Sequence, residues 1–320
     1  MLHIRVITPA PLTDQVLEVA EASAAVTNLT VLSGAARQPV GDVIQFDMAR
    51  EAADAMLSRL RELGVNRAGS ITVEQIDVSI SSGADAAERA APGYDDDAVI
   101  WDELAARTSA DTRLSWAFLA FLALATQIAG IGALLDQPIL IVGGMVLGPE
   151  FGAVAAICLG VVRREPGRVA LAARTLLVGF LVAITLTTVC ATVSRWLGWI
   201  RPSMLDHRPA TNFIVEPDKW SLIVALLAGV AGILSMTAGK STVLVGVFIS
   251  VTTVPAAGNI AIAIPLANWG EVAGSAVQLG VNLAGMMVAG IVTLAVQRAL
   301  WSRYGSRMPI VLGVGRRRTP

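Results

Sequence analysis

The sequence predicts an α-helical integral membrane protein that carries a small α+β domain at its N-terminus. Of its 320 residues, 54% are hydrophobic and only 15% are charged, a balance too apolar for a water-soluble chain of this length. The charges are concentrated in residues 1–113, 163–174 and 195–219 and in the C-terminal tail, which leaves long apolar windows between them. Apolar windows of about 20 residues are typical of transmembrane helices.

Residues 1–82 are expected to form a cytoplasmic ferredoxin-like domain with the element order βαββαβ. Gly64 should end the second helix in the left-handed conformation, which glycine adopts without steric cost. The apolar phase of the last strand slips at Glu74 and Gln75, which predicts a β-bulge there. We expect this domain either to pack and dimerise or to sense a small ligand. The predicted elements are strands beginning at Leu2, Leu29 and Ile44, helices over 12–24 and 53–63, and a last strand over 71–80.

The remaining chain is expected to contain a linker, a membrane domain and a tail. The linker covers residues 83–113 and carries an amphipathic helix over 98–107, for which Asp95–Asp97 can supply a cap. The membrane domain covers residues 114–300, and a basic cytoplasmic tail covers 301–320. Six transmembrane helices are predicted at 114–135, 138–162, 172–194, 220–239, 241–265 and 272–297.

Arginine and lysine set the expected orientation of these helices. The two short outer turns, 136–137 and 268–270, contain neither residue type, whereas the longer outer loop contains Arg195, Arg201, Arg208 and Lys219. Both termini are therefore expected in the cytoplasm, in agreement with the positive-inside rule. No signal peptide is expected, because polar, periodic sequence follows Met1. The basic residues assigned to the inner side are Arg163, Arg164, Arg168, Arg174, Lys240, Arg303, Arg307 and Arg316–Arg318.

Two predicted helices are interrupted at corresponding places in the two halves of the membrane domain. Gly148, Pro149 and Glu150 interrupt the second helix, and Pro255 interrupts the fifth. Each half has three crossings, so the second half enters from the opposite face and the repeat is an inverted 3+3 repeat. In secondary transporters of this design, broken helices expose backbone groups to a substrate near the bilayer midplane.

Glu150 is the sharpest candidate for chemistry, because a carboxylate inside an apolar span is costly unless it is protonated, paired or exposed to water. It suits proton or cation coupling, and the alternative is an acid that only binds exposed helix amides. The other polar candidates can bind a solute or ion, or can instead hydrogen-bond their own helix or hold neighbouring helices together. The predicted substrate- or ion-binding residues are Gln127, Gly148, Pro149, Glu150, Ser250, Thr252, Thr253, Pro255, Asn259 and Asn282.

Four segments resemble a known family. They are Ile100–Leu104, Leu140–Gly152, Ala225–Gly232 and Gly246–Asn259. They are similar to the bacterial membrane family of uncharacterised hydrophobic proteins, domain of unknown function 389. The resemblance covers nearly all of the membrane part and continues into the N-terminal domain. It implies a bacterial inner-membrane protein with several crossings, and it brings no activity with it.

The expected function is transport of a small solute or ion held between the two breaks, which cover Gly148–Glu150 and Thr252–Pro255. Proton or cation coupling is expected through Glu150. The alternative is a membrane-anchored sensor or assembly scaffold whose N-terminal domain binds a ligand or partner, and a channel is a third possibility. Neither an enzyme nor a metal or cofactor site is expected, because the sequence lacks the corresponding motifs and Cys158 and Cys190 lie in apolar spans. The expected partners are membrane lipid, the unknown solute or ion and further copies of the chain, with no nucleic acid.

Overall fold

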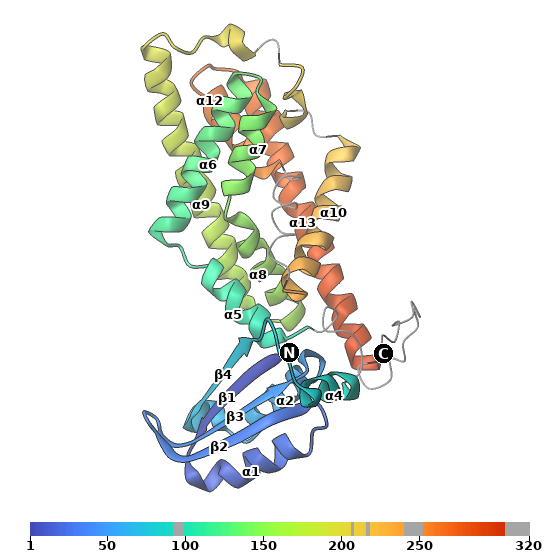
Figure 1. Ribbon diagram of the computed structural model, residues 1–320. Helices are drawn as coiled ribbons and strands as arrows, with labels where there is room; N and C mark the ends of the chain where they lie inside the picture. The colour runs from blue at the N-terminus through green and yellow to red at the C-terminus, as the bar shows by residue number, and fades with distance from the viewer. Residues whose placement is uncertain (92–98, 206–207, 216–217, 240–251, 305–320) are drawn as a thin grey trace. The chain divides into compact units, whose positions relative to one another are not determined.

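The computed structural model describes residues 1–91, 99–205, 208–215, 218–239 and 252–304 (Figure 1). The chain divides into two compact units. The first contains Met1–Asp102 and the second consists of Glu103–Arg298.

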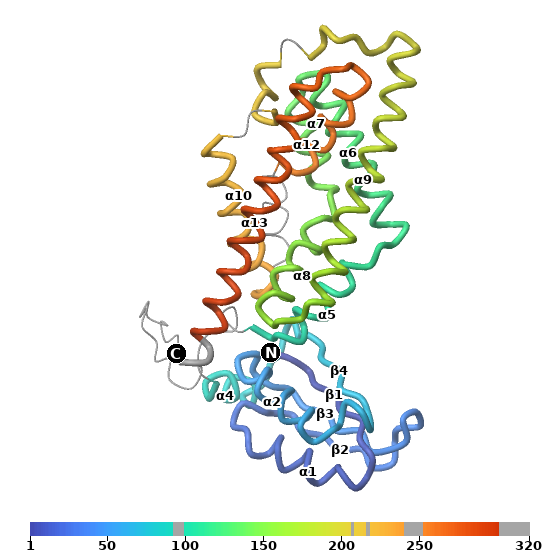
Figure 2. The backbone as a smooth tube through the Cα atoms, turned by 180° about the vertical axis from the view of Figure 1, so that it is seen from behind, coloured from blue at the N-terminus to red at the C-terminus, as the bar shows by residue number. Residues whose placement is uncertain are grey.

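The first unit is built on a four-stranded antiparallel sheet with the strand order β2-β3-β1-β4 (Figure 2). Alternate residues of the central strands, such as Ile4 and Phe46, are fully buried on one face of the sheet. Both long helices pack on that face, where Val16 and Leu60 join the same core. The elements are β1 (Leu2–Thr8), α1 (Ala10–Glu21), β2 (Val26–Arg37), β3 (Val40–Met48), α2 (Arg50–Glu62), α3 (Val65–Ala68) and β4 (Ser70–Gln75).

Two local predictions for this unit have opposite outcomes. Gly64 follows α2 with a φ of 78°, so the left-handed helix end is confirmed. The predicted bulge at Glu74 and Gln75 is wrong, because β4 pairs with β1 without a register shift and ends at Gln75. Gln75 lies opposite Leu2, the first residue of β1, so a longer β4 would have no strand to pair with. The register shifts occur instead between β2 and β3.

The predicted linker contains two helices, α4 (Ser82–Ala90) and α5 (Trp101–Asp111). Only a helix close to α5 was expected. The first turn of α4 is capped by Ser81, whose hydroxyl accepts a hydrogen bond from the amide of Ala84 at 3.0 Å. The proposed cap at Asp95–Asp97 lies outside the described residues.

The second unit is helical, and several of its helices are compatible with a multi-pass membrane protein. In the part of the chain that is described, α6, α9, α10 and α13 are long and apolar enough to cross a membrane, and α7 with α8 forms a fifth candidate span. The fifth predicted span, 241–265, overlaps residues that are not described. The helices are α6 (Trp116–Leu134), α7 (Pro138–Leu147), α8 (Glu150–Arg163), α9 (Pro166–Trp196), α10 (Lys219–Thr237), α12 (Thr253–Ala263) and α13 (Trp269–Tyr304).

The two predicted breaks differ in the structure. The first is confirmed, because α7 ends at Leu147, α8 begins at Glu150, and the two helices are bent by 52°. The second was placed over Thr252–Pro255, with the interruption at Pro255. Helix α12 begins at Thr253, inside that stretch, and Pro255 is its third residue, so the helix starts two residues before the proline. A proline is tolerated in a first helical turn, because the amide that it lacks would have no partner inside the helix.

Close packing brings α12 against α6 (Figure 2). The backbones meet where Gly258 of α12 faces Gly130 of α6. A Cβ added to Gly258 would lie 2.7 Å from the Gly130 nitrogen and 2.8 Å from the Thr126 carbonyl oxygen. Small residues at such crossings let helices approach closely inside a membrane. This contact fixes the start of α12 beside the first half of the helical unit.

Candidate functional site

Glu150 is a buried carboxylate at the first position of α8, with only 6% of its surface exposed. Its Oε1 accepts a hydrogen bond from the Thr253 hydroxyl at 2.6 Å. Its Oε2 is buried and has no hydrogen-bond partner among the described residues. Oε2 lies so close to Gly148 that a side chain at that position would collide with it. The first break therefore leaves room for the carboxylate and supplies it with one donor.

Two helix N-termini meet at this carboxylate. Glu150 begins α8, and Thr253 begins α12. The first amides of a helix have no partners within it, and their partial positive charge favours a nearby anion. The two stretches in which the sequence predicted breaks, Gly148–Glu150 and Thr252–Pro255, thus come together, and the second contains the start of α12.

The neighbouring residue, Thr252, belongs to a different polar cluster. Its Oγ1 accepts hydrogen bonds from Gln278 Nε2 at 3.0 Å and from Asn282 Nδ2 at 2.6 Å. Gln278 and Asn282 are four residues apart on α13, so they lie on the same face of that helix. Gln278 is almost fully buried, and its Oε1 has no hydrogen-bond partner among the described residues. The cluster therefore holds one unused acceptor.

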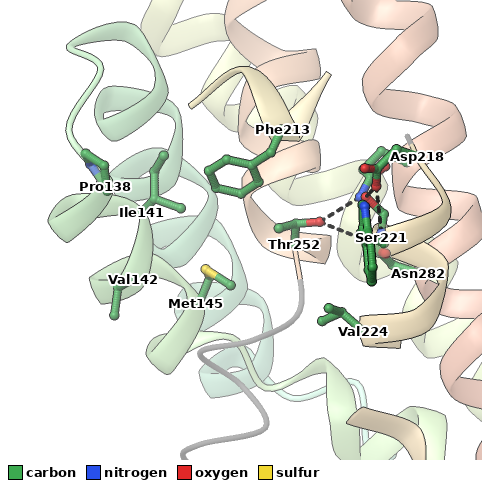
Figure 3. A pocket seen from close by; sticks show the side chains of 12 residues that line it. Pro138, Ile141, Val142, Met145, Phe213, Asp218, Ser221, Val224, Thr252 and Asn282 are labelled. Carbon is green, nitrogen blue, oxygen red and sulfur yellow. Dashed lines mark hydrogen bonds between the residues drawn. The ribbon is translucent and has the colours of Figure 1, made fainter. Parts of the chain in front are cut away.

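This second cluster borders a cavity of about 520 Å³ (Figure 3). Asp218, on the opposite side from α7, caps the start of α10 by accepting hydrogen bonds from the amide and hydroxyl of Ser221 at 2.8 and 3.0 Å. The bond from the Ser221 amide is the largest cause that lowers the pKa of Asp218 below its ordinary value. The cavity is lined by Pro138, Ile141, Val142, Met145, Phe213, Asp218, Trp220, Ser221, Val224, Thr252, Gln278 and Asn282.

A third cluster surrounds Arg208, which lies between α9 and α10 and is 6% exposed. The guanidinium pairs with Glu271 and donates to Asn259 Oδ1 at 2.8 Å. It also donates to the Ala133 carbonyl at 3.3 Å, near the end of α6. The Asn259 amide donates in turn to Glu271 at 3.0 Å and to Ser275 at 2.9 Å. This network ties the α9–α10 connection to α6, α12 and α13.

The predicted binding residues are therefore divided among these clusters. Gly148, Glu150 and Thr253 come together, and Thr252 with Asn282 lines the cavity. The other predicted residues do not join either group. Pro149 lies in the bend, Pro255 is buried in α12, Asn259 belongs to the Arg208 network, Gln127 is half-buried on α6, and Ser250 lies outside the described residues.

The sequence did not reveal the roles of Arg208 and Glu271. Arg208 was assigned to an outer loop, and Glu271 lies between an outer turn and the start of the last predicted span. The sequence could have indicated that they pair only through their opposite charges, which were predicted on the same side of the membrane. In the described ranges, no group of three or more histidine, cysteine or acidic side chains is arranged to hold a metal ion.

Comparison with known proteins gives a family match without a named activity. Residues 145–288 match the family described as Domain of unknown function (DUF389). An uncharacterized protein of Methanocaldococcus jannaschii is 29% identical over 157 residues, which cover 49% of this chain and 47% of the relative. The chain thus spans about half the length of the curated relative that it matches. No solved structure gave a significant match.

Proposed function

We propose that this chain, which carries a DUF389 domain over residues 145–288, transports a small solute or ion across a membrane. Transport is coupled to protons or another cation through Glu150. The observation that carries this proposal is the hydrogen bond between Glu150 and Thr253, because it joins the starts of two helices from different halves of the helical unit. A buried carboxylate at such a junction is costly and is typical of ion and proton pathways.

The order of the helices supports an inverted 3+3 repeat. Each half starts with a helix of 19 residues, α6 or α10, and ends with a much longer one, α9 or α13. Between these, the first half contains the α7–α8 break and the second contains the start of α12. In this proposal, residues 241–265 supply the fifth of the six crossings, and both termini lie in the cytoplasm of a cell whose inner membrane holds the protein.

The N-terminal sheet supports the proposed ferredoxin-like domain. Its elements follow the order βαββαβ apart from the short α3, and the strand order β2-β3-β1-β4 places the first and third strands in the centre. This is the arrangement expected when two βαβ units interlock. The domain is proposed to face the cytoplasm.

The contact between the two polar clusters suggests how coupling operates. Thr253 binds Glu150, and the adjacent Thr252 binds the α13 amides that line the cavity. A proton or cation that arrives at Glu150 changes what Thr253 can bind and so changes the position of the α12 start. Substrate in the cavity and a proton or cation on Glu150 then favour the same conformation of the protein. Coupled transport requires this shared preference.

A sensor is the second candidate function, and one observation favours it. A hollow of about 240 Å³ on the N-terminal sheet is lined by His3, Arg5, Gln45, Thr72 and Glu74. These side chains lie on the sheet face opposite the α1–α2 core and can bind a small polar ligand. In this function the helical unit would serve as the anchor, and no solute would cross.

Proteoliposomes with an imposed pH gradient separate the two functions. We expect wild type to accumulate at least one member of a defined mixture of small amines, alcohols, amino acids and carboxylates. The Glu150→Gln variant should lose the part of the uptake that depends on the gradient. Glu165→Gln is the matched control, because Glu165 is a partly exposed acid that pairs with Arg163 and Arg168 away from the break.

Each result decides a part of the proposal. Equal gradient-dependent uptake by wild type and Glu150→Gln would remove Glu150 from the coupling step. Uptake of no solute by any variant that inserts and folds would favour the sensor.

A further inference from the structure

The cavity beside Thr252 has two chemically different walls (Figure 3). One wall is apolar and comes from α7, which contributes Pro138, Ile141, Val142 and Met145. The opposite wall is polar and comes from the start of α10 and from α13, with Thr252 lying between the two walls. A ligand that satisfies both walls must have an apolar body and a polar end.

The polar wall offers acceptors. Gln278 lines the cavity, and its Oε1 is buried without a hydrogen-bond partner in the part of the chain that is described. A buried acceptor without a donor is destabilising, so a ligand that supplies a donor to it would bind favourably. Asp218 adds a negative charge to the same side. The Gln278 amide nitrogen is already used, because it donates to Thr252.

The charges around the cavity select against anions. Among the described residues, the twelve that line it include one acid, Asp218, and no arginine, lysine or histidine. Lys219 is close in sequence, and its Nζ lies over the Trp220 ring, 5.7 Å from the ring centroid. Phe213 also lines the cavity, and aromatic side chains attract organic cations.

We propose that this cavity binds a small organic cation, an ammonium with an apolar body, as the transported substrate. The ammonium N–H groups donate to Gln278 Oε1 and are attracted by Asp218, while the apolar body packs on the α7 wall. This assignment rests on the proposed transport function and adds the substrate class. An inorganic ion would leave the apolar wall without a partner, and a carboxylate would be repelled by Asp218.

Three ligands with the same apolar body test the substrate class. The probes are hexylammonium, 1-hexanol and hexanoate, and binding to the full chain in detergent is measured by calorimetry with empty micelles subtracted. We expect hexylammonium to bind at least about tenfold more tightly than hexanol, because hydrogen bonds to charged groups are worth about 1.5–3 kcal/mol. Hexanoate should bind most weakly.

Two substitutions assign the interaction to its residues. Gln278→Met removes the buried acceptor, and Asp218→Asn removes the charge while keeping a good helix cap. Each should weaken hexylammonium binding by about tenfold. Gln297→Met is the matched control, because Gln297 lies farther along α13, also donates to a threonine hydroxyl at 3.0 Å and does not line the cavity. Melting temperatures of all variants show which of them are folded.

The outcomes separate the substrate class from the transport function. Equal binding of the three probes, tighter binding of hexanoate, or unchanged binding by folded Gln278→Met would overturn the cation site. If hexylammonium fails to bind and another solute shows uptake that depends on Glu150, the substrate class fails and transport stands. If hexylammonium binds as expected but never enters proteoliposomes, the site stands and transport fails.

Discussion

Glu150 and Thr253, which are 103 residues apart in the sequence, form a 2.6 Å hydrogen bond between the first residues of two helices. Neither partner is exposed enough to exchange this bond for water. The bond therefore connects the break after α7 to the start of α12 directly. Thr252, the neighbour of Thr253 in the chain, lines the cavity. A change at Glu150 that moves Thr253 therefore also moves a residue of the proposed substrate site.

A double-mutant cycle measures this connection. Glu150→Met removes the acceptor and Thr253→Val removes the donor of this hydrogen bond, each with little change in volume. We expect a coupling energy of about 1–3 kcal/mol, because each single variant leaves a buried group without its partner. Unfolding in mixed micelles supplies the four stabilities. Strictly additive effects would mean that the two side chains do not interact in the folded protein.

The ion pair of Arg208 and Glu271 should behave as a buried pair. We expect Glu271→Gln and Arg208→Met each to lower the free energy of unfolding by about 3–5 kcal/mol, since each leaves one buried charge unpaired. The double variant should lose less than the sum of the two single losses. Arg107→Gln is the control. That arginine is more exposed and pairs with Glu103 one helical turn away, so its loss should cost no more than about 1 kcal/mol.

Asp42 should make the N-terminal sheet sensitive to acid. Its carboxylate accepts a hydrogen bond from the Thr13 hydroxyl at 2.6 Å and one from the Gly34 amide at 2.7 Å, and these bonds lower its pKa below 3.8. Because the pKa of Asp42 is lower in the folded protein than in the unfolded chain, the ionised carboxylate stabilises the fold. This stabilisation is complete at a pH above the pKa of the unfolded chain, and it is lost as the pH falls through the lower pKa of the folded protein.

Titration of the Asp42 carboxyl carbon by nuclear magnetic resonance checks this directly. We expect a pKa below 3.8 in wild type and a higher value in Thr13→Val, because the Thr13 hydroxyl is the largest cause of the shift. The control is Asp218, whose pKa is lowered by the Ser221 amide and not by Thr13, so its titration should not respond to that substitution. An unchanged Asp42 titration in Thr13→Val would show that the hydroxyl does not stabilise the carboxylate.

Local patterns in the sequence predicted some parts of the molecule and missed others for physical reasons. The break at Gly148 and Pro149 was predictable, because proline cannot continue a helix beyond its first turn. The same reasoning located the stretch Thr252–Pro255, but Pro255 itself lies within the first turn of α12 and does not end a helix. Arg208 was missed because its partners lie 51 to 75 residues away, and no local periodicity encodes such contacts.

The candidate site was also predicted only in part from the sequence. Glu150 was identifiable from its charge within an apolar window, but its partner depended on how α12 packs against the first half. The cavity was not predictable, because its walls come from α7, α10 and α13 and its polar side depends on which face of α13 turns inward. Asn282 was among the predicted binding residues, but its hydrogen bond to Thr252 was not predictable, because the two residues are 30 positions apart in the sequence.

The contact between α6 and α12 gives a final prediction, because α12 carries both threonines of the site. Gly258→Ala places a Cβ 2.7 Å from the Gly130 nitrogen and 2.8 Å from the Thr126 carbonyl oxygen, and backbone atoms cannot move aside as a side chain can. We expect a loss of about 1–3 kcal/mol in the free energy of unfolding, as for other overpacked positions. Gradient-dependent uptake should fall as well, since α12 must shift to accommodate the methyl group.

Gly143→Ala is the matched control for this substitution. A Cβ at Gly143, which lies on α7, would have no atom within 4 Å, and alanine favours a helix over glycine by about 1 kcal/mol. This variant should therefore be as stable as wild type or more stable, with unchanged uptake. If Gly258→Ala is as stable and as active as Gly143→Ala, then α6 and α12 do not pack as closely as the structure has them. Thr253 would then not be held against Glu150 by that contact.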